Sequence, residues 1–369
     1  MNYDPPELPL RVDLESKAIL KALPAAHRAL AELKAGAGLV PNQDILLDTL
    51  SLQEAKDSSA IENIITTHDD LYKSDYASRQ FASFAAKEVH SYARALREGF
   101  ANVRKTGLIT SNDIVTIQAT LEENNAGFRK LPGTTLKNDQ TGEIVFTPPQ
   151  DHDAIIRHMN NLEIFLNDDT ISDLDPLIKM AVIHHQFESI HPFYDGNGRT
   201  GRIINILYLI QQNLLKVPVL YLSRYINQNK SEYYRLLQAV RTDGAWEEWV
   251  MWMLKGVEKT SSQATALVAS MREIMQSYKN RMRTELPKIY SQDLLNNLFR
   301  HPYTKIDFVA RDLNVHRNTA TKYLDTLSDH NFVLKVKMGR ENFYLNGPLF
   351  DLLRGVGMPE SEAKEKATA

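Results

Sequence analysis

Twelve consecutive residues, His191 to Arg202, carry side chains that suit chemistry on phosphate groups; they read HPFYDGNGRTGR. The three glycines let the backbone turn sharply and bring its N–H groups close to a ligand. The stretch lies between two apolar segments of helical character, and a helix that begins after such a loop attracts anions through its free N–H groups and its dipole. Arg199 and Arg202 lie three residues apart, on one face of that helix, and their forks suit phosphate oxygens. The spacing predicts a polyphosphate site.

His191 and Asp195 add what a phosphate cradle lacks. An imidazole titrates near neutrality, so His191 can accept a proton from an attacking hydroxyl. A carboxylate beside phosphates suits a hard cation such as Mg²⁺, which bridges phosphate oxygens and keeps several waters. A glycine-rich turn with a buried histidine and surface arginines explains each residue singly. It does not explain the whole set, because a plain turn needs no base, carboxylate and pair of arginines together.

HPFYDGNGRTGR resembles the signature of the Fic family, HPFx[DE]GNGRxxR, at every fixed position, and the chain lacks the GxxxxGK[ST] motif of P-loop proteins. Most family members that it resembles transfer AMP from ATP to a hydroxyl side chain of a target protein. The resemblance implies that His191 is the general base and that Asp195 binds Mg²⁺. It implies that the α- and β-phosphates lie on residues 196–198 and the γ-phosphate on Arg202. The implied ATP-binding residues are Gly196, Asn197, Gly198, Arg199, Thr200, Gly201 and Arg202.

Further upstream, Ser58-x-x-x-Glu62-Asn63 is open to two interpretations. Taken alone, Asp57 or Ser58 is a helix N-cap and Glu62 is an exposed acid in the first turns of the helix. Beside the signature, the segment resembles the family's inhibitory sequence, [ST]xxxE[GN], which implies inhibitory roles for Ser58, Glu62 and Asn63. A carboxylate paired with Arg202 would take the place of the γ-phosphate and leave the α-phosphate misaligned for attack. The resemblance therefore predicts a resting state that is mostly off.

Residues 131–136 and 143–147, around a turn at 138–142, predict a short β-hairpin. Such a hairpin is either a surface ribbon or an edge to which an extended peptide can add as a strand. Fic proteins carry a flap here with a similar TPP ending, which holds the target's modifiable loop over the active site. The resemblance assigns Val145, Phe146, Thr147 and Pro148 to this flap. It also implies a tyrosine near the adenine or ribose, which we place at Tyr234, with core packing as the alternative.

Three histidines, His184, His185 and His191, raise the question of a metal site. Adjacent residues on a helix point about 100° apart, so 184 and 185 cannot both face one ion with 191. We therefore expect His184 and His185 to be structural or supporting residues.

Near the C-terminus, helices predicted at 291–299, 305–313 and 316–330 and a hairpin at 332–337 and 342–346 resemble a winged helix-turn-helix. The helix from His316 would then be the reading helix. Residues 300–347 hold eight Lys or Arg against five Asp or Glu, an excess too small to make DNA binding secure. Winged helices also serve as protein-interaction or dimer modules, so DNA binding and a homodimer are both left open.

The remaining apolar periodicity predicts helices, and composition limits the class of protein. Predicted helices occupy 14–33, 43–55, 72–107, 112–121, 151–167, 175–190, 203–211, 232–240, 246–254 and 262–283, and a proline-rich arm at 4–10 is expected to lie extended on the surface.

The net charge of −3 gives no general attraction to nucleic acid or membranes. The absence of cysteine, of an N-terminal apolar leader and of a membrane-length apolar run predicts a cytoplasmic protein.

The predicted fold is mainly α: a Fic-type helical bundle with a β-hairpin flap, followed by a winged helix-turn-helix domain. The expected divisions are 1–110 (N-terminal helical region with the inhibitory motif), 111–257 (Fic catalytic core), 258–287 (helical linker), 288–350 (winged helix-turn-helix) and 351–369 (tail). The implied function is a protein adenylyltransferase that uses ATP and Mg²⁺, is inhibited by Glu62 paired with Arg202, and modifies Ser, Thr or Tyr of a protein target, a second copy of itself included. The alternatives are a de-adenylylating or bifunctional Fic enzyme, or a nucleotide-sensing transcriptional regulator.

Overall fold

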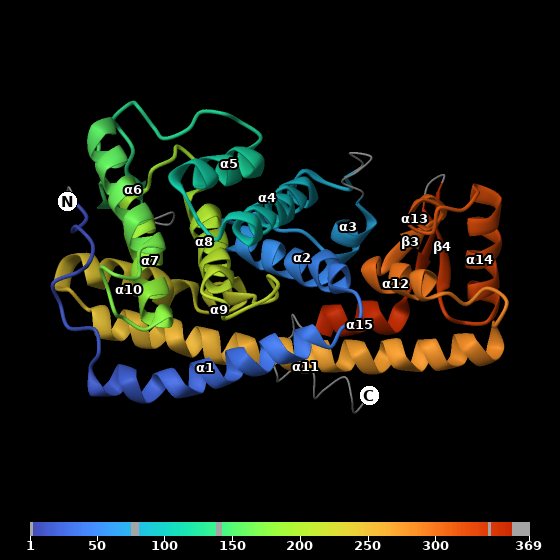
Figure 1. Ribbon diagram of the computed structural model, residues 1–369. Helices are drawn as coiled ribbons and strands as arrows, with labels where there is room; N and C mark the ends of the chain where they lie inside the picture. The colour runs from blue at the N-terminus through green and yellow to red at the C-terminus, as the bar shows by residue number, and fades with distance from the viewer. Residues whose placement is uncertain (1–2, 75–80, 138–141, 339–340, 356–369) are drawn as a thin grey trace.

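A computed structural model describes residues 3–74, 81–137, 142–338 and 341–355. This part of the chain is mainly α, as the sequence predicts, and its strands form one small hairpin and one three-stranded sheet (Figure 1). The predicted hairpin turn, apart from Gly142, lies outside the described residues. Among the helices of the described ranges, none combines the length and the hydropathy needed to cross a bilayer.

The first ten helices build the part of the molecule that holds the signature. They are α1 (Lys17–Gly38), α2 (Gln43–Ile61), α3 (His68–Lys73), α4 (Phe84–Thr106), α5 (Ser111–Glu122), α6 (His152–Asn167), α7 (Pro176–Ile190), α8 (Asn197–Gln211), α9 (Leu222–Gln228) and α10 (Lys230–Asp243). Helix α7 begins with Asp175 as N-cap and Pro176 in its first turn, a favourable combination, and every residue from Leu177 to Ile190 is buried. Helices α7 and α8 pack against each other, so the loop between them stands on two buried helices.

Helix α11 (Trp246–Glu285) runs for 40 residues and packs along α1 (Figure 1). The sequence predicts two separate helices here, and that prediction is wrong. Gly256 stands between them without breaking the helix, and a Cβ on it would lie 2.7 Å from the Tyr225 ring, so close packing on α9 accounts for this glycine. The predicted boundary at 257 therefore falls within a continuous helix, and residues 258–285 are packed against α1 and other helices.

The C-terminal unit consists of α12 (Gln292–Arg300), α13 (Ile306–Asp312), α14 (Arg317–Asp329) and an antiparallel sheet of order β3-β5-β4. The sheet contains β3 (Tyr303–Lys305), β4 (Leu334–Met338) and β5 (Glu341–Leu345), with Val336 opposite Phe343 and Thr304 opposite Tyr344. The three helices and the β4–β5 hairpin are confirmed. Strand β3 was not predicted, because three residues carry too little alternation to detect.

One prediction about the chain ends is wrong, and the other holds in part. The expected tail begins inside helix α15 (Gly347–Gly355), whose Leu353 is buried; residues 356–369 lie outside the described part. The N-terminal arm is extended, but it is packed and not simply laid on the surface: the side chain of Leu8 is 5% exposed, and its N–H donates to Asn161 Oδ1 at 2.8 Å. The N–H of Tyr3 donates to the carbonyl of Thr147 at 2.9 Å, so the arm joins the flap.

Candidate active site

The loop between α7 and α8 is held in shape by its own polar groups. His191 ends α7 in the left-handed region (φ 49°), and Gly196, also left-handed (φ 75°), precedes α8. Asn197 fixes the loop: its Oδ1 accepts from the N–H of Phe193 and its Nδ2 donates to the carbonyl of Phe193, both at 2.9 Å. No side chain caps the start of α8, so its first N–H groups are suited to phosphate oxygens. The side chain of Asn197 therefore holds the loop in shape, and its backbone belongs to the uncapped start of α8.

His191 is poised as a neutral imidazole. Burial, together with the charges of Arg129 and Arg241, lowers its pKa to about 3, and a backbone interaction with Glu188 opposes the shift. Arg129 is fully buried and donates from Nε to the carbonyl of His191 at 2.8 Å and from Nη2 to the carbonyl of Pro149 at the base of the flap. Because Nδ1 of His191 is buried, Nε2 is the ring nitrogen that an incoming hydroxyl can reach. A neutral ring can accept a proton at that atom.

Glu62 reaches both signature arginines. Its Oε1 accepts from Nη2 of Arg202 at 2.7 Å, and its Oε2 accepts from Nε of Arg199 at 2.7 Å. Ser58 holds Arg202 as well, through Oγ at 2.7 Å from Nε and through its carbonyl at 3.1 Å from Nη2. The Arg202 side chain is 3% exposed, and its pKa is raised, with burial opposing the effect of Glu62. The two cations expected to meet phosphates thus share one carboxylate.

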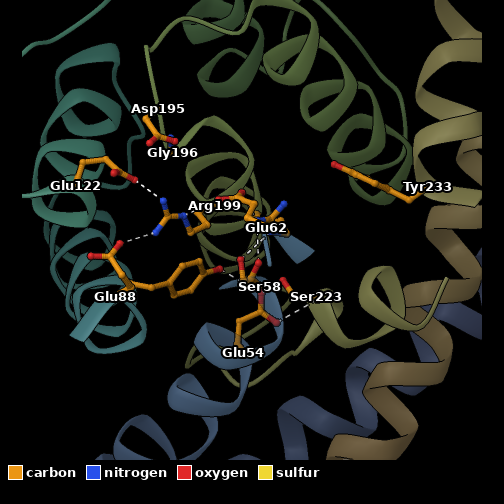
Figure 2. Close-up of polar contacts among 12 residues, drawn as sticks. Glu54, Ser58, Glu62, Glu88, Glu122, Asp195, Gly196, Arg199, Ser223 and Tyr233 are labelled. Atoms are coloured by element: carbon orange, nitrogen blue, oxygen red, sulfur yellow. Dashed lines mark hydrogen bonds and ion pairs between the residues drawn. The ribbon is translucent and has the colours of Figure 1, made fainter. Parts of the chain in front are cut away.

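These contacts depend on where α2 ends. Glu62 is the C-cap of α2, and Asn63 follows with φ 63°, a left-handed conformation that asparagine tolerates better than most residues. Ser58 therefore lies in the last turn of α2, and the N-cap interpretation of this residue is wrong. Glu54, Ser58 and Glu62 are spaced by four residues and face the signature from one side of the helix (Figure 2).

Arg199 is surrounded by three carboxylates. Besides Glu62, Glu88 of α4 accepts from its Nη1 at 3.0 Å, and Glu122 of α5 accepts from its Nη2 at 2.8 Å (Figure 2). Burial raises the pKa of Glu122 to about 7; Arg199 lowers it, and Asp195 and Glu88 raise it. In this conformation the guanidinium of Arg199 is occupied on all sides by the protein's own acids.

The other signature residues have mainly packing roles. A Cβ on Gly198 would lie 2.7 Å from Glu62 Oε1 and 2.8 Å from Arg202 Nη1, so the Glu62 contact requires glycine there. A Cβ on Gly201 would lie 3.0 Å from Phe187, which shows that this glycine allows α8 to approach α7. Thr200 is buried, and its N–H donates to the carbonyl of Gly196. Phosphate contacts at Thr200 and Gly201 remain predictions.

Asp195 is exposed beside the start of α8, and its Oδ1 accepts from the N–H of Gly196 at 2.7 Å. Mg²⁺ is usually held by one or two carboxylates, with substrate phosphates and waters as the other ligands. Within the described residues, no group of three or more His, Cys, Asp or Glu could hold a metal ion. This donor set fits an ion that binds together with phosphates.

The flap is a smaller hairpin than predicted. Strand β1 (Leu136–Lys137) pairs antiparallel with β2 (Ile144–Phe146), so the expected first strand is wrong over residues 131–135. Val145 is exposed, whereas Phe146 and Pro148 are buried and the carbonyl of Thr147 accepts from the arm. Of the four predicted flap residues, Val145 is thus the most available to a target, and Phe146 is an anchor.

Arg241 of α10 holds that anchor. Its guanidinium carbon lies 3.7 Å from the centre of the Phe146 ring, and its Nε donates to Ser189 Oγ at 3.0 Å. We expect Arg241→Ala to increase amide hydrogen exchange at residues 144–146 about thirtyfold, because a desolvated cation–π contact contributes on the order of 2 kcal/mol. Arg235→Ala, on the same helix, is the matched control. Equal exchange in both variants would show that Arg241 does not fix the flap.

The aromatic and histidine residues near the signature divide into buried and exposed sets. His184 bonds through Nε2 to Tyr233 Oη at 2.8 Å and through Nδ1 to Asn205 at 3.0 Å, and His185 bonds through Nε2 to a backbone carbonyl at 3.2 Å. Both are therefore structural, as expected. Tyr233 is buried and Tyr234 is 47% exposed, so Tyr234 is the accessible ring of the pair; its contact with adenine or ribose stays a prediction.

Glu54 is a buried acid on α2, one helical repeat before Ser58. Its carboxylate accepts from the N–H of Ser223 at 3.1 Å, from the Ser223 hydroxyl, and from Tyr92 Oη at 3.2 Å. Burial raises its pKa to about 7, against the opposing effect of the Ser223 hydrogen bonds.

The raised pKa of Glu54 predicts that the free energy of unfolding depends on pH. Between the ordinary pKa of 4.5 and about 7, folded Glu54 binds a proton that unfolded Glu54 has lost. The stabilisation is therefore complete below pH 4.5 and disappears as the pH rises through 7. Between pH 4 and pH 8, wild type should lose roughly 3 kcal/mol of unfolding free energy relative to Glu54→Gln. Urea unfolding at several pH values measures this difference, and parallel curves for the two proteins would contradict it.

Sequence reasoning missed five residues of this site. They are Glu54, Glu88, Glu122, Arg129 and Arg241. Only Glu54 left a local signal, because it precedes Ser58 by one helical repeat. The others reach the signature through contacts between distant segments; for example, Arg199 and Glu88 are 111 residues apart in the sequence.

Three protein-family models match this chain, one after another along the sequence. The Fic/DOC family N-terminal model matches residues 20–101, the Fic/DOC family model matches 108–209, and the C-terminal domain model of SoFic-like protein adenylyltransferases matches 274–349. The probable protein adenylyltransferase of Aquifex aeolicus is 30% identical over 187 residues, 49% of this chain and 54% of that protein. The protein adenylyltransferase Fic of Drosophila erecta is 32% identical over 102 residues, 28% of this chain and 19% of that protein. The chain thus matches about half or less of these relatives' length.

Solved structures share the fold. A Fic family protein from Desulfovibrio desulfuricans has a TM-score of 0.57 at 18% identity, over 92% of this chain and 98% of that one. The structure of residues 134–508 of Fic-1 from Caenorhabditis elegans has a TM-score of 0.52 at 18% identity, over 68% of this chain and 73% of that one. With the signature loop at the start of α8 and the family models matched in order along the sequence, the chain belongs to the Fic/DOC family.

Proposed function

We propose that this protein transfers AMP from ATP to a hydroxyl group of a protein target, and that Glu62 holds it in an inhibited state. The observation that carries the proposal is the position of the Glu62 carboxylate, between Arg199 and Arg202 at the uncapped start of α8. A carboxylate there takes the place that a terminal phosphate needs. The names of the relatives, protein adenylyltransferases, support the same reaction.

In the proposed reaction, the acceptor oxygen attacks the α-phosphorus of ATP. The bond from that phosphorus to the α–β bridging oxygen breaks, and pyrophosphate leaves with the bonding electrons. His191 Nε2 takes the proton of the hydroxyl, because the ring is neutral and its Nδ1 is buried, which leaves Nε2 as the accessible acceptor. The N–H groups at the start of α8 stabilise the negative charge on the phosphates, and so does Arg202 once Glu62 has withdrawn.

A magnesium ion, when bound with ATP at Asp195, would neutralise phosphate charge. Asp195 supports this role because its side chain is exposed in the loop, directly before the buried start of α8. The carboxylate of Asp195 also fixes the loop through Gly196, which keeps it beside the phosphate-binding N–H groups.

The flap supports a protein substrate. Val145 and Ile144 are exposed on β2, and a two-stranded hairpin has an outer edge to which an extended segment can add as a third strand. Phe146 and Arg241 fix the other end of this strand to the core near His191. A hydroxyl-bearing residue in the added segment would then lie above the base.

The alternatives have less support. Water activation for removal of AMP needs a free carboxylate oxygen on Glu62, and here an arginine holds each one. For a DNA-reading role, several basic side chains of the C-terminal unit are already paired with acids. Arg317 pairs with Asp307 and Lys335 with Asp325 inside the unit, and Arg300 pairs with Asp48 of α2. Phosphate contacts dominate DNA affinity, so such pairing weakens that interpretation.

Incubation with cell extract and ATP labelled on the α-phosphate tests the proposal. We expect label on protein, removable by a phosphodiesterase as AMP. ATP labelled on the γ-phosphate should leave no label on protein. Transfer of the γ-label with none from the α-label would replace adenylylation by phosphorylation.

A further inference from the structure

A cavity of about 500 Å³ lies between the N-terminal helices and the C-terminal unit, away from the signature. Helices α2, α3 and α4 form one side, and α12 and α13 form the other (Figure 1). Its volume falls within the range of about 300–1,000 Å³ that is common for small-molecule sites, which occur preferentially at such junctions. None of the signature residues lines it.

The lining of this cavity carries an excess of positive charge. Four arginines line it, Arg94, Arg97, Arg300 and Arg311, against two acids, Asp48 and Asp312. Asp48 accepts from Arg97 and, at 2.7 Å, from Arg300, so the two arginines share one carboxylate.

Arg97 and Arg311 are the arginines best placed to meet a ligand. Their side chains are 49% and 51% exposed. Arg97 uses Nη2 for Asp48, and Arg311 uses Nε for Asp312. Further N–H groups of both guanidiniums can therefore bind an anion, and the planar fork of arginine suits phosphate.

Apart from Ser74, the rest of the lining is apolar or aromatic. Leu52, Tyr72 and Phe308 line the cavity, and the His301 ring packs against the Phe308 ring at 4.6 Å between centres. A flat ring can pack on such a surface while its phosphate meets the arginines. The arginines and the aromatic side chains together favour a ligand that has an anionic group at one end and an aromatic ring at the other.

We propose that this cavity is a second ligand site, for a phosphorylated aromatic compound of the mononucleotide class. The bound phosphate would compete with Asp48 for Arg97 and Arg300. Asp48 lies in α2, the same helix that ends at Glu62, so the ligand would loosen the helix that carries the inhibitory contact. The binding site stands by itself, whereas this regulatory effect rests on the proposed AMP transfer.

Calorimetric titration of the full chain with AMP, ribose 5-phosphate and adenosine tests the site. AMP should bind wild type, and each of the two half-molecules should bind more weakly. Arg97→Ala/Arg311→Ala should weaken AMP binding at least about tenfold, because two charge-assisted contacts are lost. The same variant should keep its affinity for ATP. Arg157→Ala, which removes a similarly exposed arginine of α6, is the control. Absence of AMP binding, or equal binding in the double variant, would overturn the site.

Labelling from ATP with and without AMP tests the regulatory effect. AMP should raise labelling by wild type and have no such effect on Glu62→Gly, in which the inhibitory contact is already gone. Equal inhibition of both proteins by AMP would show that it competes at the ATP site, against the proposed link. Failure of all proteins to label would count against AMP transfer and not against the cavity, since calorimetry needs no turnover.

Discussion

Glu62→Gly should raise the rate of AMP transfer by about tenfold to a hundredfold over wild type, because misplacement of reacting atoms by about 1 Å can cost a factor of 10². The variant removes the carboxylate that accepts from Arg199 and Arg202. It frees Arg202 for a phosphate, while Glu88 and Glu122 still hold Arg199. Pyrophosphate release in the presence of a protein acceptor measures the rate. The backbone should tolerate the change, because Glu62 lies at the end of α2.

Two control variants separate charge from space. Glu62→Gln keeps the size of the side chain and removes its charge, so its rate should fall between wild type and glycine. Glu88→Gln removes one of the other two carboxylates on Arg199 and leaves the Arg202 contact intact; it should raise the rate far less. If Glu88→Gln activated as strongly as Glu62→Gly, the inhibition would act through Arg199 and not through the γ-phosphate position.

His191→Ala should lower the transfer rate by about 10² to 10⁴-fold, the usual contribution of a positioned general base. ATP binding should remain close to that of the parent, because the phosphate-binding N–H groups and arginines belong to α8, beyond the loop. Transfer rate and calorimetric ATP affinity, both measured in the Glu62→Gly background, check the two halves of this prediction.

The loop geometry requires a second variant here. His191 adopts φ 49°, which is unfavourable for alanine, so His191→Ala could lose activity through a shifted loop. His191→Asn tolerates this conformation and cannot act as a base. An active His191→Asn enzyme would exclude the general-base assignment, whereas two inactive variants that bind ATP would support it.

The contacts of the signature and of residues 58–63 were predictable because each stretch is short and contiguous. His191, Asp195 and the glycines lie within one loop, whose shape depends on neighbours a few residues away, such as Asn197 with Phe193. Glu62 and Ser58 lie one helical turn apart, and their partner Arg202 is fixed by the signature. The spacing of neighbouring residues therefore sufficed to predict which of these side chains would come together.

The surroundings of the site were not predictable from local patterns. Glu122 meets Arg199 only because α5 packs beside α8, across 77 residues of sequence. Arg241 reaches Phe146 across a similar interval and gives no motif. The continuous helix α11 was missed for a related reason. It packs against α1, which lies more than 200 residues earlier in the sequence, and local helix propensity carries no information about such a distant contact.

The most direct test of the account compares three proteins in one labelling experiment with α-phosphate-labelled ATP and Mg²⁺: wild type, Glu62→Gly, and Glu62→Gly with His191→Ala. The account predicts strong protein label with Glu62→Gly, little with wild type and none with the double variant. Equal label with wild type and Glu62→Gly would contradict inhibition by Glu62. Absence of label from Glu62→Gly, even with cell extract as the source of acceptors, would contradict AMP transfer itself.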